Sequence, residues 1–371
     1  MSTGDETARE HELRYAPERM RIQRLVASLL GIALVACASR ESVGTRSVAI
    51  LGAGVVNDPE NKSLRFDLLK FGLESFCREM LGGGVPLRMS DEEPTLGRFY
   101  ATACNTQFID EENRKTFVVQ FSGEGFASSQ QGGRLGFTTT GLVEYAPDFL
   151  LHEDSLYVYF RPRVVDATGF ETKMIESSLA KTALGVLGVS PDAFGRRVVE
   201  SQLRRGFTVL RHDASGETEF GMGIIPLGQR PYRPFTVQSE DKRTLANERT
   251  EVHVGQQDFV GPFTVEDDDQ ALYLTLALDG AAVVDALLVG EAAGRTMVRS
   301  YMQAEGPTVP SAPALLDEPV PKMGAWKRYV LVTPGRYYLV LDNSAAAGRS
   351  APPPNGGSAR VDVLVLLGER P

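Results

Sequence analysis

The stretch Thr116–Phe126, TFVVQFSGEGF, sets the fold class of the central part of the chain. Its β-branched and aromatic residues are punctuated by glycine, and the same pattern returns in Gly133–Tyr145 (GRLGFTTTGLVEY) and in Ser155–Phe160 (SLYVYF). Runs of this kind are typical of antiparallel strands joined by turns. The pattern therefore predicts a sheet in the middle of the first half of the protein.

Two helical regions are predicted on either side of these strands. From Asn61 to Leu81 the apolar residues recur at close to helical spacing, and Gly82-Gly83-Gly84 ends the helix. A second helical region covers about residues 177–205 and leads into a strand at Gly206–Arg211. Together with a buried strand at Ser47–Val56, these elements predict an α+β domain over residues 47–227.

The C-terminal part has a different pattern. Residues 228–248 (GQRPYRPFTVQSEDKRTLANE) are polar with two prolines and are predicted to be a linker. Residues 249–371 contain mostly short strands and turns, which predicts an all-β sandwich. Two Pro/Gly/Ala/Ser-rich stretches, Gly306–Gly324 and Ser344–Ala359, are expected to be long mobile surface loops.

Composition excludes several classes of function. The chain has 371 residues, of which 42% are hydrophobic, so it is an ordinary globular protein and not a disordered one. It carries 39 Lys and Arg against 48 Asp and Glu, for a net charge of −9. Nucleic-acid binding requires a basic face that displaces counterions from the phosphates, so nucleic acid is not an expected partner.

The N-terminus resembles a targeting signal. Basic Met20–Arg24 (MRIQR) precedes the apolar run Leu25–Val35, which at 11 residues is too short to span a bilayer. This arrangement predicts a secretory signal peptide over residues 1–36. Residues 1–19 carry five acids and three arginines, whereas a signal peptide begins with a basic segment. Met20 is therefore the candidate for the true first residue of the protein.

The sequence Leu34-Val35-Ala36-Cys37 resembles the lipobox of bacterial lipoproteins. The resemblance implies that Cys37 is lipidated with acyl chains such as palmitate and becomes the mature N-terminus, with residues 37–46 as a tether. Ala38 and Ser39 follow instead of an aspartate, which favours the outer membrane, on its periplasmic or surface face. The alternative is a cysteine that ends an apolar core helix by chance.

The two remaining cysteines, Cys77 and Cys104, are predicted to form a disulfide, because an exported protein meets an oxidising compartment. The bridge would close a loop of about 27 residues and contribute roughly 3 kcal/mol. The alternative is two separate buried thiols. No C-x-x-C pair occurs, so neither redox catalysis nor a zinc ribbon is expected.

The sequence contains no complete motif of catalysis or cofactor binding. There is no G-x-S-x-G elbow and no H-E-x-x-H helix. The glycines of Gly52-Ala-Gly54 lack the third glycine of a dinucleotide fingerprint and are interpreted as part of a strand. The three histidines of the mature chain lie in strand or turn contexts and are expected to be structural: His152, His212 and His253. We therefore expect no cofactor and no enzymatic activity.

Two clusters of charged residues are candidate binding sites. The acidic run Glu266–Asp269 lacks the further ligands and the glycine of a calcium loop and is predicted to be a charged turn, so no metal is expected. Four arginines on the second helical region could face anionic lipid head groups, although a solvated helix face is the commoner explanation: Arg196, Arg197, Arg204 and Arg205. No ligand-binding residue is assigned.

Two stretches resemble known families. The element order from the helix at Asn61 through Gly133–Val165 (GRLGFTTTGLVEYAPDFLLHEDSLYVYFRPRVV) to Ser201–Leu210 (SQLRRGFTVL) resembles TULIP-like lipid-binding lipoproteins. That resemblance implies a curved sheet wrapped around a helix and a hydrophobic ligand. Strands such as Thr333–Leu341 (TPGRYYLVL) resemble the pre-peptidase C-terminal (PPC-like) β-sandwich, a non-catalytic accessory module.

The sequence thus predicts a lipid-anchored envelope protein with a non-enzymatic binding or assembly role. Its expected partners are the membrane, through the lipid anchor, and an envelope protein. One alternative is a periplasmic-side carrier of lipid or another hydrophobic ligand. A further alternative is an envelope hydrolase that uses paired carboxylates.

Overall fold

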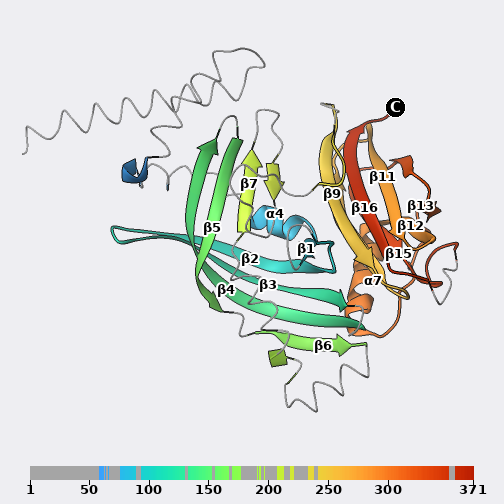
Figure 1. Ribbon diagram of the computed structural model, residues 1–371, viewed down its shortest axis with the longest axis horizontal. Helices are drawn as coiled ribbons and strands as arrows, with labels where there is room; N and C mark the ends of the chain where they lie inside the picture. Colours follow the sequence, from blue (N-terminus) through green and yellow to red (C-terminus); the bar gives the residue numbers. More distant parts are fainter. Residues whose placement is uncertain are drawn as a thin grey trace, which may run out of the picture.

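The computed structural model describes residues 58–61, 63, 66, 76–88, 93–129, 133–152, 155–166, 169–176, 190, 192–193, 196, 207–212, 218–220, 233–237, 241–350 and 356–371. These residues form three sheets with antiparallel strand pairing, one in the N-terminal half and two in the C-terminal half (Figure 1). Strands therefore dominate the described chain.

The N-terminal sheet has eight strands. They pair in the order β1-β2-β3-β4-β5-β7-β8, and β6 also pairs with β4. Their bounds are β1 (Val85–Leu87), β2 (Gly97–Glu111), β3 (Arg114–Ser129), β4 (Gly133–His152), β5 (Ser155–Asp166), β6 (Glu171–Ile175), β7 (Phe207–His212) and β8 (Thr218–Phe220). The long strands follow a continuous curve (Figure 1). Their antiparallel pairing confirms the antiparallel sheet expected from the sequence.

Helix α4 (Phe76–Gly82) lies on the inner side of this curve, after the short 3-10 helix η1 (Pro59–Asn61) (Figure 1). The Phe76 ring meets the Phe117 ring of β3 edge to face, with centroids 5.4 Å apart. Met80 packs against a cluster that includes Phe99 and Phe137. The inner face of the sheet is buried against the helix because alternate strand residues on that side are aromatic or aliphatic.

The C-terminal half is a sandwich of two four-stranded sheets. The inner sandwich sheet has the order β10-β15-β12-β13, and the outer sandwich sheet has the order β14-β11-β16-β9. Their strands are β9 (Arg243–Val252), β10 (Gln257–Val265), β11 (Gln270–Gly280), β12 (Val283–Gly290), β13 (Leu316–Pro321), β14 (Ala325–Leu331), β15 (Gly335–Asp342) and β16 (Ala359–Glu369). One hydrophobic core joins the facing sides of the two sheets.

Buried and partly buried residues alternate along the outer sandwich sheet, so only one of its faces lies on the core. Along β11, Leu272, Leu274 and Leu276 are buried in the core, whereas Tyr273 and Thr275 between them are only partly buried. Alternation of this kind is the signature of a sheet with one face on the core and one toward solvent. Strand β9 starts at Arg243, inside the 228–248 segment that was expected to be a linker.

The inner sandwich sheet is buried on both faces, because helix α7 (Glu291–Gln303) and the N-terminal sheet cover its other side. Met297, Val298 and Tyr301 of α7 pack there against Leu287 and Phe259.

Helix α7 was not predicted from the sequence, and the predicted α+β class with two helical regions needs correction. The first region is helical at α4, the second lies largely outside the described residues, and the described chain is β-rich.

The described parts of the two stretches expected to be mobile loops are bonded to the inner sandwich sheet. Gln257 of β10 binds Thr308 through both amide atoms at 2.8 Å, and Gly306–Gly324 also contains strand β13. Buried Asp342 of β15 accepts hydrogen bonds from Ser344 and Ala347. Buried Asp285 accepts a hydrogen bond from the backbone N–H of Ser350 at 2.9 Å. Residues 351–355 lie outside the described residues.

Candidate functional site

The three cysteines of the chain differ in what the structure describes of them. Cys37 lies outside the described residues, so its lipidation stays a prediction. The sulfur atoms of Cys77 and Cys104 lie 2.08 Å apart, which is disulfide distance. This pair joins α4 to the middle of β2 and so fixes the helix against the inner face of the N-terminal sheet.

His253 is the one histidine whose side chain the structure describes in its surroundings, at the end of β9. Its Nδ1 atom lies 2.8 Å from Ser358 Oγ and 3.5 Å from Glu251 Oε1. A catalytic serine–histidine–acid relay requires the serine and the acid on opposite ring nitrogens. Here one nitrogen faces both, and Nε2 is buried without a partner. Burial lowers the pKa of His253, and the negative charge of Glu251 raises it by less. The lowered pKa and the contacts favour a neutral, structural histidine.

The structure describes the acidic cluster in full and the arginine cluster only in part. Glu266–Asp269 lies in the exposed turn between β10 and β11, as predicted. Within the described part of the chain, no group of His, Cys, Asp and Glu is placed to hold a metal ion. Arg196 is described, but Arg197, Arg204 and Arg205 lie outside the described residues, as do the Gly52-Ala-Gly54 segment and the side chains of His152 and His212.

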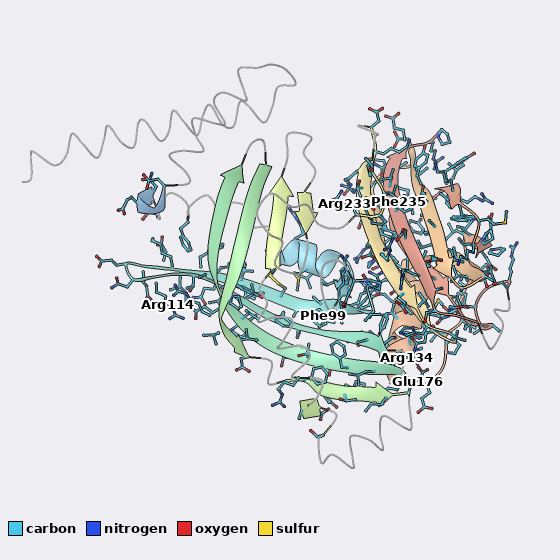
Figure 2. The ribbon with its side chains drawn as sticks, in the orientation of Figure 1. Phe99, Arg114, Arg134, Glu176, Arg233 and Phe235 are labelled. Atoms are coloured by element: carbon cyan, nitrogen blue, oxygen red, sulfur yellow. A yellow bond between two sulfur atoms is a disulfide. The ribbon has the colours of Figure 1, made fainter. Side chains whose placement is uncertain are left out.

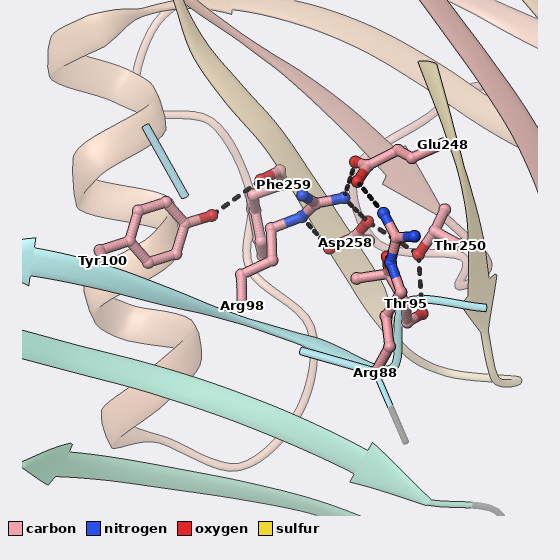
Figure 3. A network of polar contacts seen from close by, with 8 residues as sticks. All are labelled: Arg88, Thr95, Arg98, Tyr100, Glu248, Thr250, Asp258 and Phe259. Carbon is pink, nitrogen blue, oxygen red and sulfur yellow. Dashed lines mark hydrogen bonds and ion pairs between the residues drawn. The ribbon is translucent and has the colours of Figure 1, made fainter. Parts of the chain in front are cut away.

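A buried ion-pair network joins the N-terminal sheet to the sandwich (Figure 3). Arg98 of β2 is 1% exposed. Its Nε donates to Asp258 Oδ1 at 2.7 Å, and its Nη2 donates to Asp258 Oδ2 and to Glu248 Oε1, both at 2.7 Å. One guanidinium therefore binds two strands of the sandwich, β9 and β10, in the planar geometry that arginine favours.

The electrostatics of Arg98 follow from this geometry. Burial alone would lower the pKa of its guanidinium, but Asp258 and Glu248 more than offset that effect, so the pKa lies above its ordinary value. The group stays charged, and a buried charge is tolerated only with close partners. Beside it, burial raises the pKa of Tyr100, whose hydroxyl donates to the carbonyl of Phe259 at 2.7 Å.

Backbone contacts extend the junction. The N–H of Thr95 donates to the carbonyl of Arg249 at 2.8 Å, and the N–H of Glu251 donates to the carbonyl of Thr95 at 3.0 Å. These bonds make a parallel bridge between Thr95 and Thr250, so the segment before β2 lies along the edge strand β9 (Figure 3). An open strand edge would otherwise expose unpaired backbone groups.

A second arginine secures the other side of the junction (Figure 2). Arg134 of β4 is fully buried, with its guanidinium carbon 3.5 Å from the centre of the Tyr301 ring of α7. Its Nη2 donates to the carbonyl of Ala304 at 2.7 Å and lies 3.3 Å from Glu176 Oε1. Phe126 of β3 contacts the same Tyr301 ring, with centroids 5.1 Å apart. The sheet, the helix and the sandwich thus share one buried interface.

The outer sandwich sheet keeps one face toward solvent, which we call the open face. Tyr329 and Leu331 of β14 are 56% and 53% exposed. Tyr329 is the cross-strand partner of Tyr273, and Tyr273 is the partner of Leu366. At the far edge of this sheet, Asn247 of β9 binds the backbone of Phe235, so residues 233–237 cover that side (Figure 2). The open face therefore includes Tyr273, Thr275, Lys327, Tyr329, Leu331 and Leu366.

Sequence reasoning missed both arginines and helix α7. The helix had a readable signal, because its buried residues recur at helical spacing: Ala293, Met297, Val298, Tyr301 and Met302. Arg98 had only a weak signal, as a lone charge in the otherwise uncharged run Gly97–Ile109.

Comparison of the chain with protein-family models, with curated proteins and with solved structures finds no match. No helix of the described residues is long and apolar enough to cross a membrane.

Proposed function

We propose that this protein is a lipid-anchored envelope protein of the bacterial outer membrane that acts as a non-enzymatic binding module, with the open face as its contact surface. The lipobox-like sequence ending at Cys37 supports the anchor. The observation that carries the binding role is the contrast between the two sandwich sheets: the inner one is buried on both faces, and the outer one exposes tyrosine and leucine.

The composition of the open face suits a protein partner. Tyrosine is enriched at interfaces, where its ring buries a large area and its hydroxyl still finds a hydrogen bond. Tyr273 and Tyr329 lie with ring centroids 6.3 Å apart, and Lys242 Nζ lies 4.4 Å from the Tyr273 ring. Tyr329 and Leu331 are exposed on the same side of β14, and exposed apolar residues that lie together are typical of contact surfaces.

The arrangement gives less support to a carrier of hydrophobic ligands. A TULIP-like carrier would shelter acyl chains inside its curved sheet, but the described inner face is occupied by Phe76 and Met80 of α4. The PPC-like resemblance of the sandwich agrees with an accessory role, and we retain it as part of the proposal. An envelope hydrolase gains no support from His253, whose two partners share one ring nitrogen.

The anchor and the contact surface are tested separately. Cys37→Ser should move the protein from the membrane fraction to the soluble fraction after a salt wash, and persistence in the membrane would contradict the anchor. For the contact surface, a photo-crosslinking amino acid replaces Tyr329 in cells, with Glu112 in the exposed β2–β3 turn as the matched control site. We expect one defined adduct from position 329, none from 112, and loss of the adduct when Leu331→Asp is added. Equal labelling at both sites would contradict the binding role.

A further inference from the structure

A polar hollow lies on the outer face of the N-terminal sheet, beside the sandwich junction. It has a volume of about 220 Å³. Four hydroxyl side chains and one carboxylate line it, and we call it the hydroxyl pocket: Thr102, Ser122, Glu124, Thr138 and Thr140. Gly123, Thr139 and Gly169 complete its walls. It shares no residue with the open face.

Strand register brings these side chains together. Glu124 of β3 is the cross-strand partner of Thr138 of β4, and Ser122 is the partner of Thr140, so all four side chains project to one side. A register shift between Ala101 and Ala103 interrupts the pairing of β2 and turns Thr102 toward the same side, 3.3 Å from Ser122 Oγ. Irregularities of this kind commonly re-aim a side chain at a binding site.

Gly169, just before β6, closes the pocket on one side. A Cβ atom at Gly169 would lie 1.6 Å from Thr140 Oγ1, so only glycine permits this approach. The backbone at Gly169 therefore lies directly against the pocket wall.

The chemistry of the lining selects its ligand. Among the described residues, the side chain of Glu124 has no hydrogen-bond or ion-pair partner, although it is partly buried. None of the described residues that line the pocket is cationic, which disfavours phosphates and carboxylates as ligands. An ionised carboxylate only accepts hydrogen bonds, whereas hydroxyls both donate and accept. The complementary ligand is rich in hydroxyls and carries one positive charge.

We propose that the hydroxyl pocket binds a small hydroxylated amine of the amino-sugar class, with its ammonium group on Glu124 and its hydroxyls on the threonine and serine side chains. Pockets for drug-sized ligands begin at about 300 Å³, so this smaller hollow suits a single sugar ring. The inference goes beyond the proposed partner-binding role and stands independently of it.

The test uses the purified full chain in detergent and ligand-observed saturation-transfer NMR with D-glucosamine and, as the neutral match, D-glucose. We expect saturable binding of glucosamine and at least about tenfold weaker binding of glucose, since a charge-assisted hydrogen bond contributes about 1.5–3 kcal/mol. Glu124→Gln should raise the Kd for glucosamine about tenfold, to that of glucose.

Two further variants keep the result interpretable. Ser122→Leu fills the pocket and should abolish binding of both sugars, whereas Glu112→Gln removes an equivalent exposed carboxylate elsewhere and should leave both Kd values unchanged. No saturable binding to the unmodified protein would overturn the proposal, and so would a glucosamine Kd that Glu124→Gln does not change. Neither result bears on crosslinking from position 329, so the two proposals fail separately.

Discussion

Replacing Arg98 by methionine should cost the protein about 3–5 kcal/mol of unfolding free energy, because the change leaves buried carboxylates without their cation. Methionine fills much of the same volume, so the loss is mainly electrostatic. Asp258 would keep only the hydroxyl of Thr250, at 2.9 Å, and Glu248 would keep only Arg88, at 3.5 Å. The measurement is urea unfolding followed by circular dichroism, with the disulfide intact.

Two comparisons identify the cause of that loss. Adding Asp258→Asn to the Arg98→Met protein removes one unpaired charge and should restore part of the lost free energy. Lys322→Met breaks a surface pair with Asp279 in which the lysine is 51% and the aspartate 66% exposed, and should cost about 1 kcal/mol or less. If Arg98→Met costs no more than Lys322→Met, the network does not hold the sheet and the sandwich together. We also expect one unfolding transition for the unmodified protein and two for the Arg98 variant.

Replacing both Cys77 and Cys104 by serine should lower the unfolding free energy by roughly 3 kcal/mol, since their bridge spans 27 residues, and an unchanged urea midpoint would argue against the bridge. Burial raises the pKa of Asp342, so its contribution to stability is full below its ordinary pKa near 3.8 and is lost as pH rises through the raised value. The unfolding free energy of the unmodified protein should therefore fall as pH rises from 3.5 to 8, and Asp342→Asn should make this fall smaller. If the unfolding free energies of the two proteins change in parallel with pH, Asp342 is not the cause. Gly136→Ala would place a Cβ 1.9 Å from a backbone oxygen of α7 and should cost about 1–3 kcal/mol, whereas Gly290→Ala has open space and should be nearly neutral by thermal melting.

Local pattern and tertiary contacts account for what the sequence did and did not predict. The strands in Thr116–Phe126 and Gly133–Tyr145 were predictable because β-branched and aromatic residues recur there between glycines. The pairing of Arg98 with Asp258 was not, because 160 positions separate them and no local rule relates them. The stretch Ser344–Ala359 has the composition of a mobile loop, but the acid that holds its start, Asp342, lies in the preceding strand.

The long separation between Arg98 and its acidic partners also has a consequence for biosynthesis. Ribosomes add about 5–20 residues per second, so the 160 residues between Arg98 and Asp258 take about 8–32 s to follow. During that interval Phe126 and Tyr100, which the sandwich later covers, have no surface to pack against. The nascent N-terminal half therefore passes through a period in which chaperones must protect it from proteolysis and aggregation, and chains truncated before residue 241 never leave that period.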